Sequence, residues 1–464
     1  MSTAVVDGLK SALGMGGWLE APEDMAGHLV DWRNAFHGDA LMVARPKTTE
    51  QVQAVVAYCR DNDISIVPQG GNTGLSGGQI PFKNSKSIVL SMARMNQIEE
   101  VNANRFAMTA ETGCTLQNLQ EAASDVDRMF AVDLGARGTA TVGGAIGTNA
   151  GGLNVLRYGS ARDQIMGLEV VLPNGEVWDG LRALRKDATG YDLKHWFIGS
   201  EGTLGVVTRA VLKLHPKPRH KQSAFLALAG IDKLMELYAR ARALGVLDAF
   251  ELIPETGIAA ANKTIPSAIR PLETTAEWYV LMRLAGVEPI DDMFVTFLER
   301  GLEDGLLVDA AVSNSEGQEQ KLWLMRDEIL PTNIFPGKKL KYDVAVPIDR
   351  IADYQAALVK RVAEVEPAVL TYAFGHVGDG NLHVSIIQNN AVSDEVFDAK
   401  TPDIQDAVDQ LTWAFEGTIS AEHGIGQDLV KRVAGQKSEI EWSMMRQFKA
   451  TIDPKGMMNP GKMI

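Results

Sequence analysis

The chain has 464 residues, of which 45% are hydrophobic, so it is long enough for two or three domains that each bury a core. Lysine and arginine number 45 against 59 aspartate and glutamate, and the net charge of −14 argues against nucleic acid or an anionic membrane surface as a partner. Without a signal-peptide pattern or a long uncharged apolar run, we predict no transmembrane segment. With only Cys59 and Cys114, a disulfide framework is excluded, and we predict a cytoplasmic location.

The first 218 residues are predicted to form one α+β unit. Thr48 and Gln51 have the spacing of a capping box, which predicts a helix that runs towards Arg60. The segment ISIVPQG, residues 64–70, has the pattern of a buried strand that enters a loop. Further on, a Pro-Asn-Gly turn at residues 173–175 predicts a β-hairpin with a type I′ turn.

Two glycine-rich loops stand out in this unit. QGGNTGLSGG, residues 69–78, has five glycines, and GARGTATVGGAIGTNAGG, residues 135–152, has seven. Such density indicates backbone that turns tightly or approaches a ligand closely. No stretch matches the GxGxxG or the Walker A pattern, so phosphate would be bound by backbone amides in another geometry. A flavin dinucleotide, with a pyrophosphate and a flat ring system, suits both loops.

A composition change at HPKPRHK, residues 215–221, marks the predicted linker to a second domain, residues 219–410. Strand-like and helix-like segments alternate beyond it, which predicts an antiparallel sheet backed by helices. A C-terminal segment, residues 411–464, contains a second capping box, Ser438 and Glu441, at the start of its helix. The strands are expected within 224–230, 246–253, 277–286 and 306–313, and the helices around Leu234, from Asp291 to Leu302 and around Trp323.

Three of the eight histidines lie in two glycine-rich segments, GHVGDGNLH at residues 375–383 and SAEHGIG at residues 420–426. The GDG turn lets the chain double back, so that His376 and His383 can point at one centre with Glu422 as a third ligand. Two histidines and a carboxylate leave positions on a metal open for a substrate. A single histidine is more often structural, but this clustering favours a metal site.

Seven segments in this order carry a family resemblance: PQGGNTGLSGG, VGGAIGTNAGG, KDATGYDL, FIGSEGTLGVV, GHVGDGNLH, SAEHGIG and DPKGMMNPGK. From about residue 25 to its end, the chain resembles the vanillyl-alcohol-oxidase superfamily of flavoproteins. Within it, the chain resembles the D-2-hydroxyacid dehydrogenases that oxidise D-lactate, D-2-hydroxyglutarate or glycolate. The implied fold is α+β: a PCMH-type FAD-binding domain of two α+β subdomains (1–218), a substrate or cap domain (219–410), and a C-terminal helical segment that returns to the FAD domain.

The resemblance implies FAD as the cofactor, bound without a covalent link because no histidine stands in residues 69–78. The first loop would hold the pyrophosphate, the second would line the flavin and ribityl chain, and Asn459 would reach the isoalloxazine ring. Glu201, Gly202 and Val206 would border the adenine and ribose. The full predicted set is Pro68, Gln69, Gly70, Gly71, Asn72, Thr73, Gly74, Leu75, Thr141, Gly143, Gly144, Gly147, Thr148, Asn149, Gly151, Gly152, Glu201, Gly202, Val206 and Asn459.

The implied reaction gives the remaining residues their roles. Hydride would leave C2 of a D-2-hydroxy acid for flavin N5 while His423, as general base, accepts the hydroxyl proton. A divalent metal, zinc with manganese or iron as alternatives, would be held by the histidine and glutamate cluster and would acidify that hydroxyl. Arg326 and Lys341 would contact the carboxylate of the acid.

Leu330 and Ser385 stand where D-2-hydroxyglutarate enzymes tend to have Thr and Asn. This difference disfavours a dicarboxylate and favours a smaller or more apolar acid. Electrons would pass to electron-transfer flavoprotein, a quinone or a cytochrome rather than to a nicotinamide, and a homodimer is among the assemblies considered. Two alternatives stay open: a non-redox transferase on the same scaffold, like the alkyl-ether-lipid synthases, and a flavin-binding electron-transfer subunit.

Overall fold

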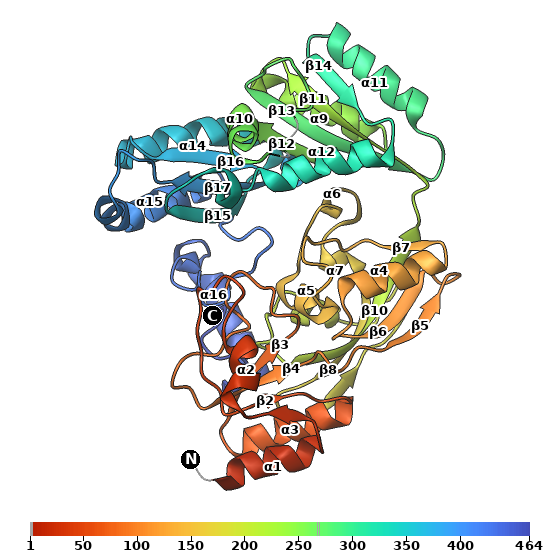
Figure 1. Ribbon diagram of the computed structural model, residues 1–464. Helices are drawn as coiled ribbons and strands as arrows, with labels where there is room; N and C mark the ends of the chain where they lie inside the picture. Colours follow the sequence, from red (N-terminus) through yellow and green to blue (C-terminus); the bar gives the residue numbers. More distant parts are fainter. Residues whose placement is uncertain (1–2, 267, 269) are drawn as a thin grey trace. The chain divides into compact units, whose positions relative to one another are not determined.

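The structure, a computed structural model, describes residues 3–266, 268 and 270–464 (Figure 1). Its contacts divide the chain into two units. The first unit combines the chain up to Lys217 with Glu422–Ile464, and the second unit is Pro218–Ala421. Position 411, where we expected the C-terminal segment to start, falls inside helix α15 (Asp394–Ala414), and the return to the first unit begins after that helix, at Glu422.

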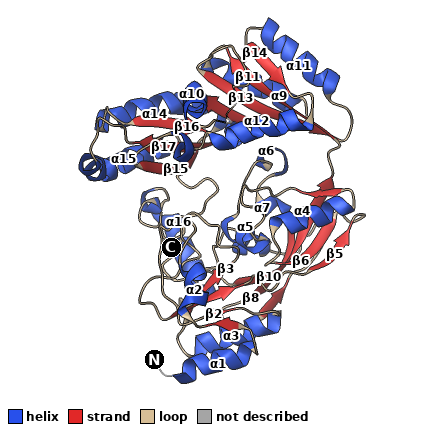
Figure 2. Ribbon diagram, viewed as in Figure 1, coloured by secondary structure: helices blue, strands red, loops and turns tan. Residues whose placement is uncertain are grey.

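Both units combine helices with sheets, so the chain has the α+β fold that the sequence predicts (Figure 2). The first sheet of the first unit has the order β1-β2-β4-β3, and β4 pairs in parallel with both β2 and β3. Apolar residues at helical spacing on α3, Val52, Val55 and Cys59, enter the same core as Ile66 and Leu90. The bounds are α1 Thr3–Leu13, β1 Trp18–Leu19, α2 Pro22–Leu29, β2 Val43–Ala44, α3 Thr49–Asp61, β3 Ser65–Gln69 and β4 Ser87–Ser91.

The second sheet of the first unit is antiparallel, in the order β5-β6-β10-β8-β9, with β7 paired to β10. Its core includes Leu168, Val170 and Leu212, against which Phe448 of the C-terminal helix α16 packs. The bounds are β5 Ile98–Asn102, β6 Ala107–Glu111, α4 Leu116–Asp125, β7 Arg128–Phe130, α5 Val142–Thr148, α6 Val155–Tyr158, α7 Ala161–Gln164, β8 Ile165–Val171, β9 Val177–Asp179, α8 Lys194–Phe197, β10 Val206–Pro216, η4 Val433–Gly435 and α16 Glu439–Ile452.

Helix-capping predictions hold in part. Ser438 and Glu441 form the expected capping box of α16. Thr48 caps α3 by accepting from the Gln51 N–H (3.3 Å), but the Gln51 side chain accepts from Lys47 N rather than from Thr48, so the predicted reciprocal bond is wrong.

The predicted hairpin forms between β8 and β9, but its type I′ turn is wrong. Gly175 N–H donates to Leu172 O (2.8 Å) across Pro173 and Asn174, and of these loop residues only Gly175 has a positive φ, +88°. This is the pattern of a three-residue loop with a glycine bulge. The predicted type I′ turn on Asn174 and Gly175 would need a positive φ at Asn174 as well, which Asn174 does not have.

Both cysteines are buried, and burial raises the pKa of each thiol to about 12. Cys59 lies in α3. Cys114 lies in the turn between β6 and α4. Such high thiol pKa values indicate structural rather than reactive cysteines.

The second unit contains the predicted antiparallel sheet, in the order β12-β13-β11-β14, together with the predicted helices. A second antiparallel sheet, β15-β17-β16, holds the GHVGDGNLH segment and was not foreseen. The bounds are β11 His220–Leu228, η1 Ile231–Lys233, α9 Leu234–Ala243, β12 Leu247–Pro254, α10 Glu255–Thr264, β13 Trp278–Gly286, α11 Asp291–Glu303, β14 Leu307–Val312, α12 Glu316–Glu328, α13 Pro331–Ile334, β15 Lys339–Ala345, η2 Ile348–Arg350, α14 Ile351–Val365, β16 Leu370–Phe374, η3 Val377–Asp379, β17 Asn381–Ile387 and α15 Asp394–Ala414.

The two sheets of the second unit meet where Leu252 of β12 and Gly375, just after β16, exchange two backbone hydrogen bonds of 2.9 and 3.1 Å. This bridge brings Glu251 beside His376. Across the described ranges, no helix has the length and apolar character needed to cross a membrane.

Candidate active site

The two glycine loops lie against each other in the first unit. A Cβ atom on Gly70 would lie 2.2 Å from Thr141 Oγ1, and one on Gly71 would lie 1.9 Å from Thr139 O. Neither position has room for a side chain, so glycine is required there by close approach. The second loop also contains the short helix α5, which Thr141 caps by accepting from Gly144 N–H (3.3 Å).

A cleft of about 380 Å³ opens along this junction, within the size range of small-molecule sites. Sequence reasoning found several of its glycine-loop residues but missed other lining residues, most of which lie outside the glycine-rich loops. Among them, His28 Nδ1 lies 2.5 Å from Gln69 Oε1. The lining residues that were missed are Gly27, His28, Ser91, Ala93, Asn96, Gly113, Thr115, Asn118, Gly138 and Thr139.

Among the described residues of the first unit, the buried polar atoms without a hydrogen-bond partner include Asn72 Oδ1, Ser91 Oγ and Asn459 Oδ1. Asn72 and Ser91 line the cleft. The Asn459 amide nitrogen donates to Gly78 O (3.0 Å) and Glu201 O (2.7 Å), which fixes the amide beside the first loop. Because buried polar atoms are rarely left unsatisfied, these residues fit a polar ligand such as the pyrophosphate and flavin of FAD.

Glu201, predicted to border the adenine and ribose, uses its carboxylate within the protein. It accepts from Ile425 N–H (2.7 Å) and Gly426 N–H (2.8 Å), and burial raises the pKa of this carboxyl group despite those bonds. Its backbone N–H donates to Gly147 O (2.8 Å). Glu201 therefore fastens the loop that follows His423 to the second glycine loop.

Glu422 and His423 lie in this fastened loop. Glu422 Oε2 accepts from Gly152 N–H (3.0 Å), which places the predicted metal ligand at the end of the second glycine loop. His423 Nε2 lies 3.5 Å from Glu422 Oε1. The backbone bends at both residues, and Gly424 follows with a φ of +76°.

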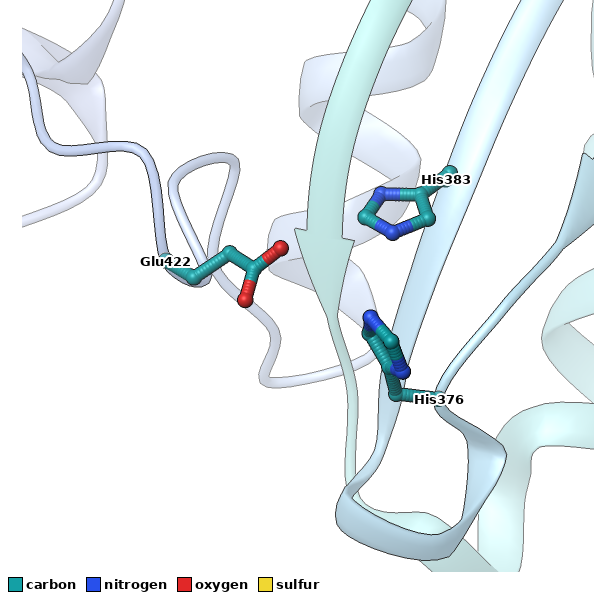
Figure 3. A group of neighbouring side chains, drawn as sticks. All are labelled: His376, His383 and Glu422. Atoms are coloured by element: carbon teal, nitrogen blue, oxygen red, sulfur yellow. The ribbon is translucent and has the colours of Figure 1, made fainter. Parts of the chain in front are cut away.

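His376 and His383 are brought together in the second unit, as Figure 3 shows. Their ring centroids are 5.1 Å apart, at an interplanar angle of 81°. Positive φ at Gly375 (+133°) and Gly380 (+88°) lets the chain reverse between β16 and β17. Figure 3 also draws Glu422, whose preceding residue, Ala421, donates its N–H to Asp343 O (3.1 Å).

Sequence reasoning missed Glu251, which binds two of the predicted residues. Its Oε1 lies 2.7 Å from His376 Nδ1, and its Oε2 accepts from Arg326 Nε (3.0 Å). Burial alone would raise the pKa of Glu251, but His376 and Arg326 outweigh burial and hold it at about 2. The available signal was a carboxylate inside the apolar strand LDAFELIP, residues 247–254.

The other predicted substrate residues lie on different elements. Lys341 on β15 stands directly opposite Ser385 on β17, and Lys341 is exposed whereas Ser385 is buried. Leu330, 39% exposed, precedes α13. Asn381 donates from Nδ2 to Asp343 Oδ1 (2.9 Å) and Val344 O (2.8 Å), which ties the turn to β15.

Two family models match the chain. Residues 217–463 match the family described as FAD linked oxidases, C-terminal domain, and residues 40–180 match the FAD binding domain. Two solved structures share the fold, each with a TM-score of 0.75 and covering 99% of this chain. They are an alkyldihydroxyacetonephosphate synthase (18% identical, 86% of that chain covered) and a p-cresol methylhydroxylase (16% identical, 96% covered).

Curated relatives are more similar in sequence. The mitochondrial D-2-hydroxyglutarate dehydrogenase of Bos taurus is 36% identical over 447 residues, 96% of this chain and 80% of the relative. A D-2-hydroxyglutarate dehydrogenase of Xanthomonas citri pv. viticola is 35% identical over 95% of this chain and 93% of its own length. A D-2-hydroxyglutarate–pyruvate transhydrogenase of Saccharomyces cerevisiae is 33% identical over 96% and 90%, respectively.

These matches define an FAD-linked oxidase with a PCMH-type FAD-binding domain. The chain belongs to the family of FAD-linked oxidases that includes the D-2-hydroxyglutarate dehydrogenases, which confirms the resemblance of the seven motifs. FAD is therefore the cofactor that its binding domain serves. The relatives named above carry D-2-hydroxyglutarate in their names, not D-lactate.

Proposed function

We propose that the protein oxidises a D-2-hydroxy acid to the 2-oxo acid, with D-2-hydroxyglutarate as the first substrate to test. The observation that supports this best is the buried pair of Arg326 and His376, whose Nη2 and Nε2 atoms lie 3.5 Å apart. Arg326, a cation suited to a substrate carboxylate, thus lies beside His376, a side chain suited to bind a metal. The names of the relatives favour the dicarboxylate over the smaller acid that Leu330 and Ser385 suggest.

We propose His376, His383 and Glu422 as ligands of a divalent metal, zinc first with manganese or iron as alternatives. Two imidazoles and one carboxylate are a donor set that zinc accepts with a position left open. When bound, the metal would polarise the hydroxyl of the substrate. The paired imidazoles of the second unit and the anchoring of Ala421, next to Glu422, on β15 support this choice.

FAD, when bound, supplies the acceptor for the hydride that leaves C2. Arg326 would bind the substrate carboxylate through its Nη atoms, since Nε donates to Glu251, and Lys341 would add a second cation. His423 would accept the hydroxyl proton at a ring nitrogen. The two electrons and the C2 hydrogen leave together as hydride, the hydroxyl proton leaves to His423, and the product is the 2-oxo acid.

We propose that the residue opposite Lys341 adjusts the length of acid accepted, because Ser385 pairs directly with Lys341 across β15 and β17. The electron acceptor remains predicted as electron-transfer flavoprotein, a quinone or a cytochrome. The cytoplasm and a homodimer remain predictions as well. The Bos taurus relative is named as mitochondrial, whereas the name of the Xanthomonas relative gives no compartment.

The test is anaerobic bleaching of the flavin by a panel of D- and L-2-hydroxy acids, followed by turnover with a dye acceptor. We expect bleaching by D-2-hydroxyglutarate and no bleaching by its L-enantiomer. If no D-2-hydroxy acid reduces the FAD of the zinc-supplemented protein, the proposal is wrong. That result would favour the non-redox transferase or the electron-transfer subunit instead. Bleaching by D-lactate alone would restore the smaller acid that the sequence favoured.

A further inference from the structure

Glu251 lies in β12 between the buried residues Phe250 and Leu252, and is itself 1% exposed. The backbone bridge from Leu252 to Gly375 fixes the end of β16 against β12, so His376 follows directly beside the carboxylate. Each carboxylate oxygen takes a different neighbour: Oε1 is 2.7 Å from His376 Nδ1, and Oε2 is 3.0 Å from Arg326 Nε. One buried group therefore contacts two residues of the proposed site at once.

The chemistry of the carboxylate fixes which atoms carry protons. An ionised carboxylate only accepts hydrogen bonds, so both neighbours must donate. Arg326 donates its Nε–H, and His376 must then carry its proton on Nδ1. In a neutral ring this leaves the lone pair on Nε2, the nitrogen through which a metal would be bound.

We propose that Glu251 is a positioning residue that holds His376 in the Nδ1–H tautomer for metal binding and aligns Arg326 for the substrate carboxylate. This inference rests on the proposed function. Metal-binding histidines commonly donate their second ring N–H to a carboxylate, and loss of that partner weakens metal affinity by about 10–100-fold. Glu251 would differ from a partner of the histidine alone in that its second oxygen aligns Arg326, the cation that would bind the substrate carboxylate.

Glu251 accepts hydrogen bonds from both His376 and Arg326. Glu251→Gln cannot do both, because an amide has one acceptor oxygen and one donor group. A guanidinium keeps its protons, so the amide oxygen would go to Arg326. The amide N–H would then face His376 Nδ1 and favour the opposite tautomer, with the proton on Nε2. Metal affinity is expected to fall because the ligand atom is then protonated.

Asp248 offers a matched control on the same strand. It is 3% exposed and accepts from Arg283 Nε (2.7 Å), so Asp248→Asn removes another buried carboxylate–arginine pair. Because this pair holds a different arginine, the variant reproduces the loss of stability without altering the partner of His376.

The experiment uses full-length, FAD-loaded protein and two measurements. In metal-free protein with ¹⁵N-labelled histidine, the ring nitrogen shifts of His376, assigned by comparison with His376→Gln, report its tautomer. Competition with a chromogenic chelator then gives the Zn²⁺ dissociation constant. We expect an Nδ1–H ring in the wild type and in Asp248→Asn, an Nε2–H ring in Glu251→Gln, and zinc affinity about 10–100-fold weaker in Glu251→Gln alone.

Several outcomes would overturn the inference: an Nε2–H ring in the wild type, wild-type zinc affinity in folded Glu251→Gln, or equal losses in Glu251→Gln and Asp248→Asn. If Glu251→Gln does not fold, Glu251→Asp decides, because its carboxylate is one methylene farther from His376. Unchanged zinc affinity and tautomer in that variant would also reject the role. A wild type without zinc affinity would instead reject the proposed metal, while the tautomer still tests Glu251.

Discussion

At the scale of single residues, hydrogen bonds from side chains hold the segment that carries Glu422 and His423. Glu422 accepts from Gly152 N–H and also lies near His423. The two neighbouring residues carry different proposed roles, Glu422 as a metal ligand and His423 as the general base. The Ser76 hydroxyl lies 3.2 Å from His423 O and 3.0 Å from Gly424 O and shares its one proton between them, and Glu201 accepts from the N–H groups of Ile425 and Gly426. Hydrogen bonds thus hold the backbone from His423 to Gly426.

We predict that His423→Asn keeps FAD and metal but lowers the rate of flavin reduction by D-2-hydroxyglutarate by about 10²-fold or more, the usual scale for a lost general base. Asparagine preserves the size of the side chain but cannot accept a proton. Stopped-flow absorbance without oxygen measures the rate. His37→Asn, at an exposed position of the same unit, is the control; near-equal rates in wild type and His423→Asn would remove His423 from the mechanism.

At the scale of elements, apolar runs predicted strands well and long-range partners poorly. The strands β11 to β14 were predicted because each contains a largely apolar segment between turn signals, which is a local property. The sheet β15-β17-β16 was missed because its central strand contains Asn381, His383 and Ser385, whose polarity indicated chemistry rather than a buried strand. Glu251 was missed for a related reason: strand patterning predicts burial, but not which partner compensates a buried charge.

The sequence motifs located the glycine loops and the histidines of the candidate site, but not the residues that reach it from other elements. Glycine spacing located both loops and the reversal between His376 and His383, because a turn needs particular residues at particular positions. It did not locate His28 or Ser91, which reach the cleft from α2 and β4 through tertiary packing. The type I′ assignment failed because Asn174 lacks the positive φ that this turn needs beside that of Gly175.

The junction of the glycine loops gives a prediction at this scale. Gly71→Ala places a methyl group 1.9 Å from Thr139 O, so the loops must separate. Overpacking typically costs about 1–3 kcal/mol, and we expect FAD affinity to fall by roughly 5- to 150-fold. Fluorescence titration of FAD into apoprotein measures this. Gly135→Ala, in the second glycine cluster with nothing within 4 Å of its Cβ, should bind FAD as the wild type does; equal affinity in both variants would dissociate the junction from FAD binding.

At the scale of the whole molecule, the proposed functions divide between the two units. The cleft and the unsatisfied polar atoms of the proposed FAD site belong to the first unit. The imidazole pair, Arg326 and Lys341 belong to the second unit, and Glu422 is the first residue of the returning segment. The chain crosses between the units at Lys217–Pro218 and at Ala421–Glu422, so a predicted metal ligand follows the second crossing directly.

This division predicts that metal and FAD can be lost separately. His383→Ala should remove most of the bound metal and abolish bleaching by D-2-hydroxyglutarate, while one FAD per chain remains and is released intact by acid. The physical reason is that His383 lies in β17 of the second unit and takes no part in the glycine loops. Metal analysis and the flavin absorbance of the same sample measure both quantities.

His220→Ala, in β11 of the second unit, controls for the loss of an imidazole. Loss of FAD together with metal would show that the two sites are not independent, and flavin that stays on the acid-precipitated chain would contradict non-covalent binding. Full metal and full bleaching in His383→Ala would assign the imidazole pair to structure alone, and the chemistry would then rest on His423 and the flavin.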